Sequence, residues 1–442
     1  MIALTHVCRD WREVFTSRSS LWTGFCCEDA DKTRVYLQRS KSSPIDLWIY
    51  REDNLLPHDP IHQVIPLATS RLKSLRVEGS LESLPDITAR LTHPAPLLED
   101  LLIDGTHGDN PEYNPVLPTS LFNGDLSSLH KLCLEGVQTE LPWRNMVNLT
   151  SFDLWCAPPG EVSVRHLLNF FENAPRLRKI NFDTPTTSGV RNGRLVSLKH
   201  LKKVVMVGDA LPSILLDHLL VPVGAKLTTR IDIYGPMFEN HLPRSLDNIR
   251  NLSGFTRVRL CLDSLYSNVQ FSGPNGQVHM FSLTSHGNPT HLAFGSLGRF
   301  NTLKTERLRI DYGDPLSSDS VYQVLLPMKD LRTLTLNQCR NPHFIRALCP
   351  GISPSGVVVC PNLEELILIY GVRGETPDIE GFRGMAAARA SRGTKLNSIR
   401  ILTHLGVEQF DTSELEEHVS HVECGPEVTV SDDNGYSSDE EY

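Results

Sequence analysis

The feature that most constrains the fold of this 442-residue chain is a six-residue phrase that recurs ten times. Each copy has an apolar residue, two variable residues, a second apolar residue, one variable residue and a third apolar residue. The first six copies start 26, 31, 20, 28 and 24 residues apart. A period of roughly 20–30 residues is typical of a solenoid of stacked units, not of a compact enzyme domain. The ten copies are Leu72/Leu75/Val77, Leu98/Leu101/Ile103, Leu129/Leu132/Leu134, Leu149/Phe152/Leu154, Leu177/Ile180/Phe182, Leu201/Val204/Met206, Phe255/Val258/Leu260, Leu331/Leu334/Leu336, Leu363/Leu366/Leu368 and Leu396/Ile399/Ile401.

The spacing within each phrase predicts a β-strand with two inward-facing side chains. In Leu334-Thr335-Leu336, for example, both leucines point to one face of the strand and the threonine points to the other. One such strand cannot bury its apolar face alone, so we expect the copies to stack into a parallel sheet with a continuous core. The first leucine of each phrase is expected to lie in the preceding turn.

The segments between copies predict helices and loops on the other side of the sheet. Residues 162–174 have apolar residues at positions 164, 167, 168 and 171, which is helical spacing, and they stop before Pro175. Residues 213–220 and 320–328 have the same character. Alternating leucines also mark buried strands in other α/β proteins, but ten copies favour the repeat interpretation.

The rhythm weakens between residues 207 and 330. Leu227 with Ile231/Ile233, and Leu308 with Ile310, look like degenerate copies. Residues 264–302 contain the run Ser-Gly-Pro-Asn-Gly-Gln and are expected to form an inserted hairpin or loop, in which Val278, Phe281 and Leu283 could belong to a strand. Such an insertion could carry binding specificity or be a tolerated expansion.

The ten phrases resemble the leucine-rich-repeat family. The match is strongest at Leu331-Arg-Thr-Leu-Thr-Leu-Asn-Gln-Cys339, which supplies the family's asparagine-or-cysteine position. Most other copies lack that residue. The resemblance therefore implies an α/β fold in the form of an irregular leucine-rich-repeat solenoid, with parallel strands on one face and helices and loops on the other.

The charge of the chain is unevenly distributed. The net charge is −9, but residues 408–442 contain twelve Asp and Glu and no Lys or Arg, which leaves residues 1–407 at +3. The final residues have almost nothing apolar to bury and are predicted to be disordered. Ser437 and Ser438 precede acidic residues, as acidophilic kinases prefer, although a purely solubilising segment has the same composition. We therefore divide the chain into residues 1–44, the repeats at 45–405 with the insertion near 264–302, and the acidic residues 406–442.

The composition indicates an intracellular protein. With no run of 18 uncharged apolar residues, the sequence predicts no membrane span. The amino terminus lacks the basic region and long apolar core of a secretory signal. The ten cysteines are scattered, and the adjacent pair Cys26-Cys27 is too close for an ordinary disulfide. These features predict reduced cysteines and a cytoplasmic or nuclear location.

The amino-terminal segment predicts a small amphipathic helix. Leu4, Val7, Cys8, Trp11 and Phe15 fall on one helical stripe, and Leu21-Trp22 comes after a polar break. Taken alone, this pattern indicates only that a short helix with two tryptophans nearby packs on another surface. The candidate contact residues are Val7, Cys8, Trp11, Leu21 and Trp22.

These residues also carry a family resemblance. Val7-Cys8-Arg9-x-Trp11-Arg12, with Leu21-Trp22 about ten residues later, resembles the carboxyl-terminal half of the F-box. The run from Arg34 to Ser40 and then Ser43 to Ile49 is similar to the segment after the F-box in F-box-like families of mushroom-forming fungi, where a helix ends in an arginine-serine pair before the first strand. The resemblance, about residues 1–405, implies a Skp-type adaptor as one partner and an unidentified protein substrate as the other.

One departure from the F-box pattern affects the adaptor expectation. The sequence starts inside the latter half of the motif, so we expect the first F-box helix, which supplies much of the adaptor-binding surface, to be missing. Either the sequence is truncated or adaptor binding is weakened. Trp11 and Trp22 could also cap the open end of the solenoid.

The sequence contains no motif that predicts an enzyme. The sequence has no Walker-type phosphate loop, no G-x-G-x-x-G after a strand, no H-E-x-x-H, no paired C-x-x-C and no G-x-S-x-G. His418 and His421 lie in an acidic segment and are expected to be solvated. Asp311 and Asp314 flank Gly313 and are interpreted as turn formers. The basic runs Lys199–Lys203 and Arg389–Lys395 are weak indications of nucleic-acid binding, so we expect no nucleic acid, metal or cofactor.

The sequence thus favours a non-enzymatic substrate receptor of a Skp–cullin–F-box ubiquitin ligase. The alternative is a leucine-rich-repeat interaction scaffold that does not bind the adaptor. A hydrolase with an unrecognised site is the third and least favoured class. Target contacts are expected on the outward side of the strands, at residues such as Arg76, Asp100, Lys131, Arg332 and Glu365.

Overall fold

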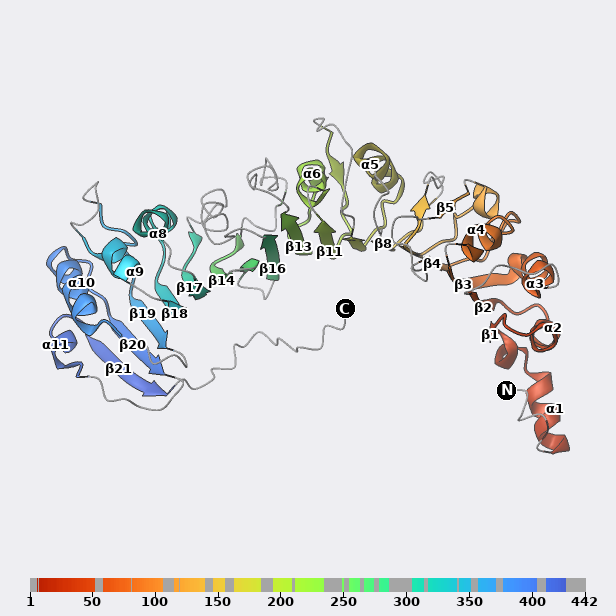
Figure 1. Ribbon diagram of the computed structural model, residues 1–442, viewed down its shortest axis with the longest axis horizontal. Helices are drawn as coiled ribbons and strands as arrows, with labels where there is room; N and C mark the ends of the chain where they lie inside the picture. The colour runs from red at the N-terminus through yellow and green to blue at the C-terminus, as the bar shows by residue number, and fades with distance from the viewer. Residues whose placement is uncertain are drawn as a thin grey trace. The chain divides into compact units, whose positions relative to one another are not determined.

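The protein has a mixed α/β fold in two compact units, Met1–Pro222 and Val223–Tyr442. A computed structural model describes residues 6, 8–51, 59–80, 82–105, 115–118, 120–139, 146–155, 163–183, 194–208, 211–233, 249, 254–262, 266–273, 278–285, 304–313, 317–339, 342–350, 357–370, 377–403 and 411–426. In each unit, helices lie on one side of a mainly parallel sheet (Figure 1).

The first unit is built on a parallel sheet. The strands have the spatial order β1 (Gly24–Cys26), β2 (Ile45–Arg51), β3 (Leu72–Gly79), β4 (Asp100–Asp104), β6 (Lys131–Glu135), β8 (Ser151–Trp155), β9 (Lys179–Asp183) and β11 (Lys203–Gly208). The expected sheet is present, and it begins one strand earlier than the resemblance implied, because β1 precedes the helix that leads into β2. Two short pairs lie apart from it: β5 (Val116–Leu117) with β7 (Gln138–Thr139), and β10 (Val196–Ser197) with β12 (Leu219–Leu220).

Helical segments precede, connect and follow these strands. They are α1 (Arg9–Ser17), η2 (Ser19–Trp22), α2 (Ala30–Arg39), α3 (Ile61–Ala68), η3 (Thr69–Arg71), α4 (Ser83–Thr88), η4 (Leu121–Gly124), α5 (Val164–Asn173) and α6 (Leu211–His218). The helix predicted at 162–174 is confirmed as α5, which buries Leu167, Leu168 and Phe171 and ends just before Pro175. The helix predicted at 213–220 corresponds to α6, which starts two residues earlier and ends at His218. The last two residues of the predicted helix belong to β12.

The second unit has a sheet with one antiparallel interruption. The pairings give the order β13 (Lys226–Ile233), β16 (Val278–Ser285), β15 (Tyr266–Ser272), β14 (Arg257–Leu262), β17 (Arg307–Gly313), β18 (Thr333–Cys339), β19 (Glu365–Tyr370), β20 (Ser398–Thr403) and β21 (His421–Pro426). The helices are α8 (Ser318–Leu325), α9 (Pro342–Leu348), α10 (Ile379–Ser391) and α11 (Ser413–Glu416). The helix predicted at 320–328 corresponds to α8.

The interruption accounts for the weakened rhythm in the sequence. β15 pairs antiparallel with both β14 and β16, so the segment expected to be an insertion forms a hairpin. The hairpin strands lie within the sheet, between β13 and β14, because β13 pairs with β16. The two hairpin strands therefore extend the sheet itself. Residues 264–265, 274–277 and 286–302 of the predicted insertion lie outside the described residues.

The core consists of rows of apolar side chains that run across neighbouring strands. All thirty apolar residues of the ten phrases are buried, and the parallel register places Leu101, Leu132 and Phe152 side by side. The Phe152 ring packs against Phe170 and Phe182, with centroids 4.6 and 5.4 Å away. The predicted inward-facing pairs are thus confirmed, and helix α5 closes the row from the side.

The sheet continues past residue 405, where the sequence placed the end of the repeats. β21 pairs in parallel with β20, and α11 precedes it. His421 is the exposed first residue of this strand, and His418 is half-buried. The acidic part of the chain therefore contributes the strand β21, which ends at Pro426.

Replacing Leu132 by Ala should destabilise the protein by about 2–5 kcal/mol, because it opens a cavity in the row of buried side chains. Lys131→Ala, on the same strand but exposed, should change stability by less than about 0.5 kcal/mol. Urea unfolding monitored by circular dichroism measures both changes. Equal effects of the two substitutions would contradict the inward and outward assignment.

Candidate functional site

Helix α1 presents an unburied apolar stripe. None of its residues is buried, and the side chains of Trp11 and Val14 are 48% and 51% exposed. The Trp11 ring lies 5.7 Å from that of Phe15, one turn along the helix, and Cys8 at the N-cap is exposed. Val7, another candidate from the sequence, lies outside the described residues. Sequence reasoning missed Val14, although its position three residues after Trp11 places it beside the stripe.

Trp22 has a different environment from Trp11. Its side chain is fully buried, and its indole Nε1 donates a hydrogen bond to the Phe15 carbonyl at 2.6 Å. The ring lies edge-on to Tyr36 of α2 at 5.2 Å, and the Arg39 guanidinium is 4.4 Å from its centre. Leu21 beside it is half-buried. Trp22 therefore holds the end of α1 against α2.

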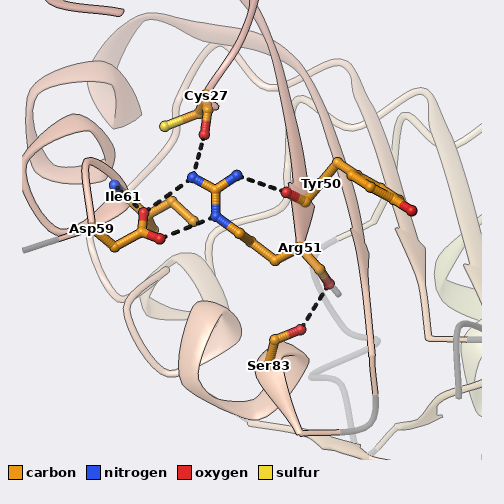
Figure 2. Close-up of polar contacts among 6 residues, drawn as sticks. All are labelled: Cys27, Tyr50, Arg51, Asp59, Ile61 and Ser83. Atoms are coloured by element: carbon orange, nitrogen blue, oxygen red, sulfur yellow. Dashed lines mark hydrogen bonds and ion pairs between the residues drawn. The ribbon is translucent and has the colours of Figure 1, made fainter. Parts of the chain in front are cut away.

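An arginine-centred network holds this amino-terminal segment to the sheet (Figure 2). The Arg51 side chain, at the end of β2, donates to the Cys27 carbonyl at 2.6 Å and to the Tyr50 carbonyl at 2.7 Å. It also donates to both Asp59 carboxylate oxygens, at 3.0 and 3.2 Å. Ser83 Oγ donates to the Arg51 carbonyl at 3.0 Å. One side chain thus links the end of β1, β2 and the start of α3.

The Arg51–Asp59 pair is largely shielded from water, with side chains 16% and 12% exposed. Burial raises the pKa of Asp59, but the Arg51 hydrogen bond and the Ile61 backbone donor outweigh it, so the pKa stays below its usual value. The carboxylate is therefore charged at neutral pH, as a buried ion pair requires. Sequence patterns gave no signal for this pair, which joins two elements through a loop.

The outward-facing residues expected to contact a target pair with their neighbours. Lys131 lies 3.7 Å from Asp100, and Arg332 lies 3.4 Å from Glu364. Glu365 lies 3.9 Å from Arg400, and Arg76 pairs with Glu78 and lies over the Trp48 ring at 5.0 Å. These contacts are mostly exposed, so each contributes little to stability and remains open to exchange with a partner.

Asp311, interpreted from the sequence as a turn former, is a strand residue of β17, and that interpretation is wrong. Its buried carboxylate accepts hydrogen bonds from Arg309 at 2.7 Å and Asn337 at 2.9 Å, and it also pairs with Arg259. Burial raises the pKa of Asp311, but these donors together outweigh it and lower the pKa. Asp314 lies outside the described residues.

Two of the thiols, those of Cys133 and Cys27, are poorly suited to act as nucleophiles. Burial, aided by the Asp153 and Glu135 carboxylates, raises the pKa of Cys133 on the outward face to about 12. Burial likewise raises the pKa of Cys27 to about 11. Both thiols are therefore protonated at neutral pH, whereas the thiolate is the reactive form.

The possible metal ligands and the basic run 389–395 bear on the binding of metal ions and of nucleic acid. Within the described ranges, no cluster of three or more His, Cys, Asp or Glu could hold a metal ion. In the basic run 389–395, Arg389 is fully buried and donates to the carbonyls of Val359 at 2.9 Å and Cys360 at 2.8 Å. Its guanidinium thus supports a loop and is inaccessible to a nucleic acid.

Comparison with known proteins gives no family assignment, since no protein-family model and no curated protein matches the chain. In the part of the chain that the structure describes, every helix is too short or too polar to cross a membrane.

Trp22→Ala and Trp11→Ala should differ in their effect on stability, because Trp22 holds α1 against α2 whereas Trp11 lies on the exposed stripe. Removing the buried Trp22 ring should lower the free energy of unfolding by about 3–5 kcal/mol. Removing the half-exposed Trp11 ring should cost less than about 1 kcal/mol, because little of it is shielded from water. Thermal and urea unfolding of both variants measure the difference, and a larger loss for Trp11→Ala would contradict these roles.

The Arg51–Asp59 pair should make stability depend on pH. Because the folded-state pKa of Asp59 is depressed, its contribution is complete above the unfolded pKa of about 3.9 and is lost as pH falls through the lower folded value. Asp59→Asn should therefore cost roughly 1.5–3 kcal/mol at pH 7, with the gap to wild type narrowing below about pH 4. Unfolding free energies from pH 7 to pH 3 test this. A gap that stays constant over this range would refute the proposed charge state.

Proposed function

We propose that the protein is an irregular leucine-rich-repeat solenoid that binds a protein target on the outward face of its sheet. We further propose that its amino-terminal segment binds the Skp-type adaptor of a cullin-based ubiquitin ligase. The observation that carries the second proposal is α1, whose apolar side chains are exposed although its end is held by the buried Trp22. An exposed apolar stripe on an anchored helix is suited to docking in a partner's groove.

The features of the sheet support target binding. Neighbouring strands place charged and aromatic side chains such as Trp48, Arg76 and Lys131 on the outward face, while the apolar rows fill the core. A receptor of this kind acts by raising the effective concentration of its target near the ligase's catalytic partner. The proposed role needs no catalytic residue in this chain, and it places the protein in the cytoplasm or nucleus.

A second candidate function is an interaction scaffold without adaptor binding. Trp22, one of the two tryptophans that carry the F-box resemblance, is committed to the protein's own core. A purely structural role is enough to explain this burial. The two functions share the target-binding sheet and differ only in what α1 contacts.

Binding to a purified Skp-type adaptor discriminates between these functions. The chain should bind the adaptor, and Trp11→Ala/Val14→Ala should weaken binding at least about tenfold, because truncation of a central aromatic contact costs about 1.4 kcal/mol or more. The matched control is Leu67→Ala/Leu97→Ala, which removes two exposed apolar side chains elsewhere in the same unit. Biolayer interferometry measures the affinities.

Two outcomes would favour the scaffold. The first is no adaptor binding by the unmodified chain. The second is binding that is equally reduced by the α1 variant and by the control, since a specific contact on α1 should respond only to the first.

A further inference from the structure

Four arginines lie together on the outward face of the second unit. The parallel register of β14 and β17 places Arg257 opposite Arg307 and Arg259 opposite Arg309. We call these four residues the arginine ladder and each opposed pair a rung. Neighbouring strands are about 4.8 Å apart, so each rung brings two positive charges close together.

The two rungs differ in their partners. Arg259 and Arg309 share the buried Asp311 carboxylate. Arg257 and Arg307 are exposed, and their guanidinium groups have no hydrogen bond or ion pair with any residue that the structure describes. On either side, the register places the uncharged Ser272 and Thr333.

An unpaired rung of this kind favours an anionic partner. Like charges directly opposite each other destabilise a sheet, and an intervening carboxylate removes that repulsion. Guanidinium groups also bind carboxylates through two parallel hydrogen bonds. The nearest acid along the same row, Glu365, lies two strands beyond Arg307 and is engaged with Thr333 and Arg400. An anion bound at this rung would therefore come from another part of this chain or from another molecule.

The second unit has a segment of matching charge. Residues 427–442 come after β21 and contain six Asp and Glu and no Lys or Arg. We propose that the arginine ladder binds this acidic segment of its own chain. The contact goes beyond the proposed function, because it requires neither an adaptor nor a target.

Chain length decides which acids can reach the ladder. β21 lies four strands from β17 and five from β14, and Pro426 is at the opposite end of its strand from the unpaired rung. On a flat sheet this separates Pro426 from the rung by about 25–30 Å. Asp433, seven residues on, reaches about 25 Å only when the chain is fully extended, whereas Asp439, thirteen residues on, reaches more than about 40 Å. The distal group Asp439-Glu440-Glu441 is therefore assigned to the rung.

The test measures competition between the attached segment and an added copy. A fluorescein-labelled peptide with the sequence of residues 427–442 is titrated with the full chain and monitored by fluorescence anisotropy. In the Asp439→Asn/Glu440→Gln variant, the peptide should bind about fivefold more tightly than in the wild type, because a tethered competitor of roughly millimolar effective concentration has been weakened. The matched control Asp432→Asn/Asp433→Asn removes the same charge nearer Pro426 and should bind the peptide as the wild type does.

A second pair of variants locates the peptide. In the Asp439→Asn/Glu440→Gln background, Arg257→Gln/Arg307→Gln should weaken peptide binding at least about tenfold. Arg346→Gln/Arg392→Gln, which removes two exposed arginines from α9 and from the turn after α10, should leave it unchanged. Circular dichroism melts establish that all variants are folded, and binding should weaken with salt.

Three results would overturn the proposal. One is no peptide binding by the Asp439→Asn/Glu440→Gln chain. Another is peptide binding that survives Arg257→Gln/Arg307→Gln. The third is equal, arginine-dependent binding by the wild type and by the Asp439→Asn/Glu440→Gln chain, which would assign the ladder to an acidic segment of another molecule. None of these outcomes bears on adaptor binding, so the two proposals fail separately.

Discussion

The structure depends on one constraint: the strand formed by each of the ten phrases has two inward apolar side chains, and a single strand with its connection cannot bury them. Parallel pairing in register meets this constraint, because it places the inward side chains of one strand beside those of the next, as with Leu101, Leu132 and Phe152. The rows that result are fully buried and are closed by helices such as α5. Connections between strands can therefore vary in length without disturbing the core.

The same constraint leaves the outward face free for polar chemistry. Side chains that alternate with the buried rows form exposed ion pairs in the first unit and the arginine ladder in the second. Where a carboxylate on this face is buried, as at Asp311, several donors keep it charged. At the start of the sheet, Arg51 likewise keeps a shielded carboxylate charged, and its guanidinium donates hydrogen bonds to two backbone carbonyls as well.

The sequence predicted the elements well wherever a local period specified them. The ten phrases and the helix at 162–174 are confirmed because spacing alone decides which face of a strand or helix is apolar. The sequence could not show that Trp11 is exposed and Trp22 buried, since both are aromatic residues in one short segment. Only packing against α2 buries Trp22. The interpretation of Asp311 failed for the same reason, because its donors come from three strands.

By itself, the sequence determined an α/β fold with parallel strands, their inward residues and the acidity of the last segment, because these depend only on period and composition. Only the tertiary structure decided the order of strands in the second unit, where the β15–β16 hairpin lies between β13 and β14. It also decided which charges meet: Arg51 with Asp59, and Arg257 with Arg307. These contacts depend on register between segments far apart in the chain, which no local pattern encodes.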